Sequence, residues 1–209
     1  MPLGANSKSK EIWNGVVERC EKRLSRWKSQ YLSRCGRLVL INSVLDALPT
    51  YLMSAFPLPA KVEERIDALR RNFLWHGEKE YKGFHLVEWK TLLLSKKQGG
   101  LAIKNLRKQN KSLLMKWLWR FPLEEQSLWG RVIQAKYGKE GPWKTKEVTS
   151  TYGTSLWRSI RNLWHGFYAK TECNVNNGRK IRFWEDNWLG NGSLKRLFPD
   201  IHHLNQQQE

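Results

Sequence analysis

Apolar residues recur every three or four positions through most of this chain of 209 residues, which is the spacing of one face of an α-helix. Polar and charged residues fill the positions between them, so the expected helices are amphipathic. Prolines and glycines interrupt the pattern and divide it into separate helices. The helices predicted in this way cover residues 10–28, 33–48, 60–75, 89–94, 105–120, 123–137 and 154–167.

The second and third helices have the clearest pattern, and the rest of the chain is organised around them. Ser33 is a candidate N-cap, because its hydroxyl can accept a hydrogen bond from a free amide in the first turn. Pro49 cannot continue the second helix, since it has no amide hydrogen and its ring clashes with the preceding turn. The two apolar stripes consist of Leu38, Ile41, Leu45 and Leu48, followed by Val62, Ile66, Leu69, Phe73 and Leu74.

Near the C-terminus the pattern changes to one that is typical of strands. The tripeptide Asn176-Asn177-Gly178 suits a hairpin turn, because Asn and Gly tolerate positive φ. Residues 172–175 and 180–184 flank this turn and are predicted to pair. Residues 84–87 and 101–103 are predicted to form a second two-stranded ribbon, which would need packing support.

These elements predict a mainly α fold: a helical bundle with a small C-terminal β-hairpin element. We expect a loose N-terminus over residues 1–8 and a helical domain over 9–138. A polar, lysine-rich linker covers 139–153, and a subdomain of one helix plus the hairpin covers 154–200. Residues 201–209 are polar and are expected to be frayed.

The chain carries a large surplus of positive charge, with 37 Lys and Arg against 19 Asp and Glu and a formal net charge of +18. Such a surplus favours a polyanionic partner, either nucleic acid or an anionic membrane. The alternative is a solvated basic surface with no partner. Two helices carry cations at helical spacing, which favours phosphate contact without sequence readout. These two stripes are Arg19, Lys22, Arg23 and Arg26, and Lys104, Arg107, Lys108 and Lys111.

A third candidate site lies on the predicted hairpin, where Arg182 and Trp184 are close in sequence. An aromatic ring beside a guanidinium can stack on the bases of a single strand. The alternative for Trp184 is packing in the core, which is the favoured use of most of the 12 tryptophans.

Cysteine usage and the apolar runs indicate where the chain resides. Cys20, Cys35 and Cys173 are widely spaced and include no CxxC, which argues against a disulfide framework and against a zinc ribbon. Residues 1–10 have no apolar segment typical of a signal peptide. No apolar run is long enough to cross a membrane, so we expect no membrane partner. These features predict an intracellular location, and a nuclear one fits the charge.

The acidic residues argue against catalysis by this chain. A polymerase needs paired aspartates that hold two metal ions, whereas Asp46, Asp67, Asp186 and Asp200 are separated from one another. Glu185 stands beside Asp186, but neighbouring residues in a strand face opposite ways. A turn at the end of the strand, in which Asp186 caps the segment of Trp188, is therefore favoured over a metal site. The sequence predicts no catalytic residue, no bound metal and no cofactor.

Short motifs over residues 13–199 carry a family resemblance. They include Leu24-Ser25-x-Trp27-Lys28, Leu32-Ser33-x-x-Gly36-Arg37, Leu48-Pro49-x-Tyr51-x-Met53-Ser54, Gly99-Gly100-Leu101-x-Ile103-x-Asn105-Leu106 and Phe183-Trp184-x-Asp186-x-Trp188. In order and spacing this set resembles the region after the polymerase palm in plant LINE-type (non-LTR) retrotransposon reverse transcriptases, which are RNA-directed DNA polymerases. Cys35 departs from the pattern, because the family usually has a second glycine there.

The resemblance implies that residues 9–138 form a thumb-like bundle that helps to hold a template–product duplex beside the palm. The family's aromatic-x-Asp-Asp palm motif is absent from this chain, and the resemblance begins downstream of it. A palm domain is therefore an implied partner, together with RNA, DNA or a hybrid. In the family, a zinc-binding segment with Cys and His residues follows this region.

The leading hypothesis is a non-catalytic, nucleic-acid-binding fragment that contacts the template–product backbone. Two alternatives are a Trp-rich protein-interaction module and a non-functional retrotransposon remnant. A metal-dependent nuclease that uses Glu185 and Asp186 is a less favoured alternative.

Overall fold

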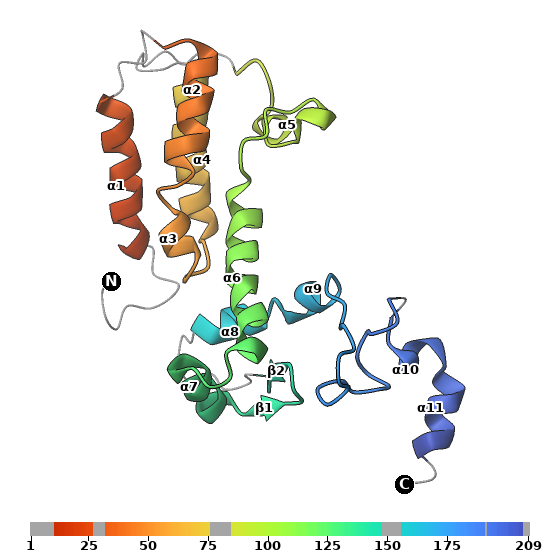
Figure 1. Cartoon of the computed structure of the whole chain (residues 1–209). Helices are drawn as coiled ribbons and strands as arrows, with labels where there is room; N and C mark the ends of the chain where they lie inside the picture. Colours follow the sequence, from red (N-terminus) through yellow and green to blue (C-terminus); the bar gives the residue numbers. More distant parts are fainter. Residues whose placement is uncertain (1–10, 27–31, 76–84, 148–155, 191, 207–209) are drawn as a thin grey trace. The chain divides into compact units, whose positions relative to one another are not determined.

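The computed structural model describes residues 11–26, 32–75, 85–147, 156–190 and 192–206 (Figure 1). Over these ranges the chain is mainly helical and has one short antiparallel sheet of two strands. The predicted fold class, mainly α with a small β-hairpin, is therefore confirmed.

The chain divides into two compact units, one of residues 1–116 with 152–156 and the other of residues 117–151 with 157–209. Helix α6 begins in the first unit and ends in the second. The first unit contains α1 (Glu11–Arg26), α2 (Arg34–Leu40), the π-helical turn η2 (Ile41–Leu45), α3 (Thr50–Met53), α4 (Ala60–Trp75), α5 (Trp89–Leu92), the 3₁₀ turn η3 (Lys96–Gln98) and the start of α6 (Leu106–Leu123). The second contains α7 (Leu128–Tyr137), β1 (Lys139–Glu140), β2 (Lys144–Thr145), most of α8 (Leu156–Arg161), α9 (Trp164–Tyr168), α10 (Leu194–Leu197) and α11 (Pro199–Gln206).

The helix predicted over residues 33–48 is present but is interrupted by a π-helical turn. Ser33 is its N-cap as predicted, and its hydroxyl accepts a hydrogen bond from the Gly36 amide at 3.2 Å. After Leu40 the helix widens into η2, where the Asp46 amide donates to the Ile41 carbonyl at 3.0 Å. The turn buries Ile41 and brings the Asp46 carboxylate into the interior.

The core of the first unit forms where α1, η2 and α4 pack together. Their apolar stripes face one another, as the helical spacing predicts. Trp13 is fully buried and is the largest side chain in this core. The other fully buried apolar side chains from these three elements are Val16, Val17, Cys20, Ile41, Leu45 and Ile66.

A buried arginine connects four segments of the first unit. Arg70 of α4 is 1% exposed, and its guanidinium lies 3.0 Å from Asp46 and 2.7 Å from Asp67. It also donates to the Lys104 carbonyl at 2.8 Å and stacks over the ring of Trp89. We refer to these five residues as the Arg70 cluster. Burial raises the pKa of both carboxyl groups, and the charge of Arg70 opposes this rise.

Asn110 fastens α6 to the link between α3 and α4. Its side-chain amide donates to the carbonyls of Met53 and Phe56 at 2.8 Å each, and its oxygen accepts from the Leu58 amide at 2.9 Å. Three backbone groups in a segment that contains prolines are satisfied in this way. The side chain is 5% exposed, so these bonds are protected from water.

The second unit has a core of aromatic rings. Trp129 lies 5.4 Å from Trp117 and 6.2 Å from Trp157 between ring centroids, and Phe121 contacts both Trp129 and Trp157. The Trp157 indole donates to the Thr145 hydroxyl at 3.0 Å, which attaches α8 to the sheet. Tilted and edge-on rings at these distances stabilise a core beyond the area that they bury.

The small hairpin lies elsewhere than predicted. β1 and β2 pair within residues 139–145, which were predicted to be linker, and Gly141 has a φ of 66° in the turn between them. The predicted strands over 172–175 and 180–184 are wrong. There the Cys173 amide donates to the Asn187 carbonyl, and the Arg182 amide donates to the Asp186 carboxylate.

Two smaller expectations also differ from the structure. The ribbon of residues 84–87 with 101–103 is wrong over the described residues 85–87 and 101–103, because the amides of Leu101 and Ala102 donate to the carbonyls of Leu92 and Leu94 at the end of α5. Phe84 and Thr154 lie outside the described residues. Residues 201–206, expected to be frayed, form most of α11. Among the described helices, none has the length and apolar character needed to cross a membrane.

The Arg70 cluster predicts unequal losses for its two carboxylates. Replacement of Asp46, which is fully buried, leaves a buried guanidinium short of charge compensation, and we expect Asp46→Ala to lower the free energy of unfolding by about 3 kcal/mol. Asp67 is 18% exposed and water can replace it in part, so Asp67→Ala should cost about 1 kcal/mol. Urea unfolding monitored by circular dichroism measures both values. Equal losses would contradict the assigned geometry.

The three cysteines should differ in reactivity toward iodoacetamide at pH 8. Burial raises the pKa of Cys20 to about 11, so its thiol stays protonated and inert in the folded chain. Cys35 is exposed and should be alkylated first, whereas burial also raises the pKa of Cys173 and should slow its reaction. Peptide mass mapping after timed quenching measures the order. Cys20 should react only after denaturation. Equal rates for Cys20 and Cys35 in the native chain would contradict the burial of Cys20 between α1 and the rest of the core.

Candidate nucleic-acid interface

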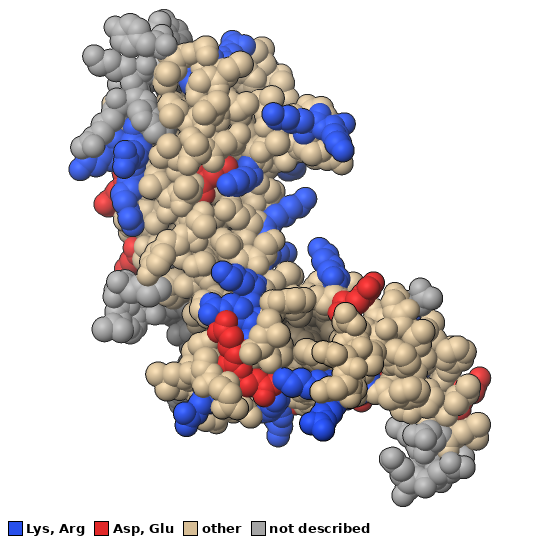
Figure 2. Space-filling view, in the orientation of Figure 1, with Lys and Arg blue, Asp and Glu red and all other residues tan. Residues whose placement is uncertain are grey.

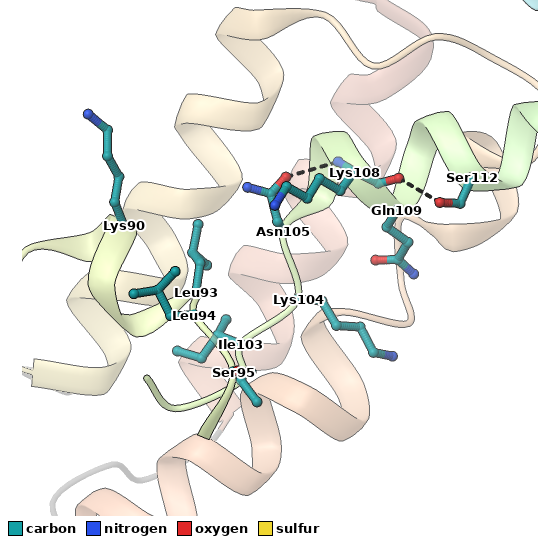
Figure 3. Close-up of a pocket in the computed structure, with 11 residues that line it drawn as sticks. Lys90, Leu93, Leu94, Ser95, Ile103, Lys104, Asn105, Lys108, Gln109 and Ser112 are labelled. Atoms are coloured by element: carbon teal, nitrogen blue, oxygen red, sulfur yellow. Dashed lines mark hydrogen bonds between the residues drawn. The ribbon is translucent and has the colours of Figure 1, made fainter. Parts of the chain in front are cut away.

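A basic pocket of about 550 Å³ lies between the end of α5 and the start of α6. Three lysines, Lys90, Lys104 and Lys108, contribute to its lining, and none of the described residues that line it is acidic. The close-up in Figure 3 shows the α5 side chains on one side and those of α6 on the other. The remaining lining residues are Leu93, Leu94, Ser95, Ala102, Ile103, Asn105, Gln109 and Ser112.

A tight turn after α5 forms one wall of this pocket. Gly99 has a φ of 81°, and a Cβ atom on Gly100 would lie 2.1 Å from the Leu94 carbonyl oxygen. Only glycine allows this close approach of two backbone segments. The turn brings residues 101–103 back beside α5, where the Ala102 amide donates to the Leu94 carbonyl at 2.9 Å. The turn therefore places Lys104 next to the end of α5.

The first turn of α6 forms the other wall. Asn105 is its N-cap, and its side-chain oxygen accepts from the Lys108 amide at 2.9 Å. In Figure 3 the Lys108 side chain runs back beside Asn105. The positive end of the helix dipole adds to the charge of Lys104 and Lys108 at this point. The arrangement suits a negatively charged ligand.

The cations around this pocket differ in how far they are compensated. Lys104, Lys108 and Lys111 form no ion pair with any described residue, and all three are exposed. Lys90 lies 3.7 Å from Glu88, but both side chains are highly exposed and the pair is weak. Arg107 differs, because its guanidinium donates to Glu63 at 2.8 Å, and this hydrogen bond raises the pKa of Arg107. Lys104, Lys108 and Lys111 are therefore the members of the predicted stripe that remain available.

The stripe on α1 lies on a different side of the first unit. Arg65 of α4 pairs with Glu21 of α1, whereas Glu63 of α4 pairs with Arg107 of α6. Two positions along a helix correspond to a rotation of about 200°, so α1 and α6 pack on opposite sides of α4. Figure 2 shows one group of basic side chains over α1 and another over α5 and α6. The two stripes therefore do not form one surface.

The described α1 cations are exposed, and one of them makes a hydrogen bond within the helix. The Arg19 guanidinium donates to the Gly15 carbonyl at 2.9 Å, one turn earlier in the same helix. The side chains of Lys22 and Arg23 are exposed. Arg26 is the last residue of α1, and its side chain lies outside the described part of the chain.

Arg182 and Trp184 occupy internal contacts of the second unit. The Arg182 guanidinium donates to Asp186 at 2.8 Å and also pairs with Glu185. Burial opposes the protonated form of Arg182, but the hydrogen bond to Asp186 raises its pKa. The ring of Trp184 packs edge-on against His202 at 5.4 Å between centroids. These contacts reduce the surface that either side chain offers to a nucleobase.

The Asp186 carboxylate closes a turn, but it does so back toward Arg182 and not over the segment of Trp188 that the sequence analysis favoured. It is fully buried, and its second oxygen accepts from the Arg182 amide at 2.9 Å. Both oxygens are thus held by one arginine. Among the described residues, no group of three or more His, Cys, Asp or Glu side chains is arranged to hold a metal ion.

Sequence reasoning missed three residues of this region. Arg70 sits on the apolar stripe of α4, four residues after Ile66, and this position was a usable signal of burial. Lys90 and Gln109 line the pocket, but their roles depend on the turn at residues 95–100, which brings two distant segments together. No spacing in the sequence indicates that approach.

Two plant proteins are similar to this chain. One, from Arabidopsis thaliana, is named "Putative ribonuclease H protein At1g65750" and is 34% identical over 205 residues, which cover 94% of this chain and 32% of that relative. The other, "Uncharacterized mitochondrial protein AtMg00310" from the same plant, is 27% identical over 147 residues, which cover 68% of this chain and 93% of that protein. No family model and no solved structure matches the chain. The chain thus resembles the relative named for ribonuclease H over nearly its whole length and spans about a third of that protein.

Proposed function

We propose that this chain binds the phosphate backbone of nucleic acid through the basic pocket and the α6 lysines beside it. Three lysines near the positive end of α6 carry this proposal: Lys104, Lys108 and Lys111. All three are exposed, and none of them forms an ion pair with a described residue. Backbone contacts by lysines give affinity without sequence readout. The proposal assigns no catalytic step to the chain.

We further propose that the chain is a retrotransposon-related segment that corresponds to the region after the palm of a LINE-type reverse transcriptase. Its motif order supports this, as does its likeness to a protein that is named for a ribonuclease and therefore for action on RNA. In such a protein the chain would contact the backbone of a template–product duplex beside the palm. The preferred probe for a binding experiment is therefore an RNA–DNA hybrid.

Replacement of Lys104, which precedes α6, and of the α6 residues Lys108 and Lys111 should weaken binding and flatten its salt dependence. In the triple variant Lys104→Gln, Lys108→Gln, Lys111→Gln, each lost phosphate contact should reduce the slope of log K against log salt by about 0.9. We expect a total reduction of about 2 to 3 and an affinity loss of ten- to a hundredfold in low salt. Fluorescence anisotropy with a labelled RNA–DNA hybrid across a salt series measures both quantities.

The matched control removes three charges from the other side of α4. The triple variant Arg19→Gln, Lys22→Gln, Arg23→Gln has the same net charge as the α6 variant. We expect it to retain most of the affinity, because only net charge has changed and no proposed contact is lost. Equal losses for the two variants would show that binding reflects the overall charge, and absence of binding in low salt would refute the proposal.

A second candidate function, docking of a protein partner, is favoured by an apolar pocket in the second unit. This pocket has a volume of about 260 Å³, and its lining includes Trp119, Leu123, Trp143 and Trp164. Trp119 and Leu123 are 55% and 68% exposed, which is unusual for such large apolar side chains. Binding of a protein through this pocket would persist at high salt, whereas phosphate contacts would not.

A further inference from the structure

The basic pocket combines a cationic rim with an apolar floor. Leu93, Leu94 and Ile103 lie between Lys90 and the α6 side chains in Figure 3. The backbone of a duplex is a continuous outer surface and needs cations but no apolar recess. A volume of about 550 Å³ lies within the range of sites that take a small organic molecule. The pocket therefore fits a ligand that has both an apolar ring and a phosphate.

The wall of the pocket also contains a buried acceptor with no partner. The side-chain oxygen of Gln109 is buried and makes no hydrogen bond to any described residue, while its nitrogen donates to the Thr50 hydroxyl at 3.3 Å. A buried unpaired oxygen is costly unless water or a ligand supplies a donor. Nucleobases carry amino and imino donors on their edges, and glutamine is a common partner of such edges.

From these features we propose that the pocket binds one unpaired nucleotide of a nucleic-acid strand. Its base lies on the floor formed by Leu93, Leu94 and Ile103 and donates to Gln109, while its phosphates contact Lys104 and Lys108. A base inside a duplex cannot enter, because its edge is already paired and its faces are stacked. This inference rests on the proposed function and deepens it, since it predicts that the chain prefers a strand end or a single-stranded overhang to a blunt duplex.

The test separates the base from the phosphate. The full chain is titrated against three labelled RNA–DNA hybrids: one blunt, one with a two-nucleotide overhang, and one with an overhang of two abasic nucleotides. The last two carry the same charge and differ only in the bases. We expect about fivefold tighter binding to the overhang with bases than to the abasic one, because burial of a ring and one hydrogen bond are gained.

Three variants identify the pocket as the source of this preference. Leu94→Gln makes the floor polar without a change of charge, and Leu94 is 42% exposed, so the fold should tolerate it. Gln109→Leu removes the acceptor. Each should reduce the preference for bases, because each removes one of its two contributions, and should leave the affinity for the blunt hybrid within about twofold. Lys111→Gln, outside the pocket, should weaken binding to all three probes equally.

The outcomes distinguish this inference from the proposed function. No binding to any hybrid would refute both. Binding without discrimination between the base-bearing and abasic overhangs would overturn the nucleotide pocket and leave the backbone interface intact. An undiminished preference in both Leu94→Gln and Gln109→Leu would also overturn the pocket, because the bases would then be bound elsewhere. Circular dichroism melts confirm that each variant is folded.

Discussion

A buried positive charge organises the first unit. Because arginine stays protonated at any pH that the fold survives, Arg70 must be compensated where it is, at 1% exposure. The compensation comes from η2 through Asp46, from α4 through Asp67 and from the segment before α6 through the Lys104 carbonyl. Loss of any of these groups weakens the compensation of the buried charge, and loss of the fully buried Asp46 weakens it most. The cluster thus fixes the position at which α6 begins.

The same requirement explains why the surface near α6 is so basic. Asp46 and Asp67 are committed to Arg70 inside the unit, and Glu63 is committed to Arg107 at its edge. These acidic groups therefore do not compensate the lysines of the pocket. With 37 cations against 19 acids in the chain, pairing of the acids by arginines leaves a local excess of exposed lysines. The pocket is basic because the nearby acidic side chains are paired with Arg70 and Arg107.

Helical periodicity predicted the positions of the helices well, because most helices here have one apolar face and a recognisable cap or stop. Ser33 is the N-cap of its helix, as expected. The hairpin was misplaced because turn chemistry alone does not determine pairing: Gly178 does have a φ of 70°, yet the backbone donors around it bond to Asn187 and Asp186. The pocket was beyond prediction from spacing, since it depends on the contact between Gly100 and the Leu94 carbonyl.

Charge periodicity identified two stripes but could not rank them, since both have four cations at helical spacing. The structure separates them by placing α4 between their helices. On α1 the described cations lie on an exposed helical surface, where salt screens their attraction to a polyanion. At the start of α6, Lys104 and Lys108 border a recess that also has an apolar floor and an unpaired buried acceptor. Charge alone attracts any polyanion, whereas this combination can discriminate among polyanions. Under both proposals, the start of α6 would bind the nucleic-acid backbone and also select an unpaired strand end over a blunt duplex.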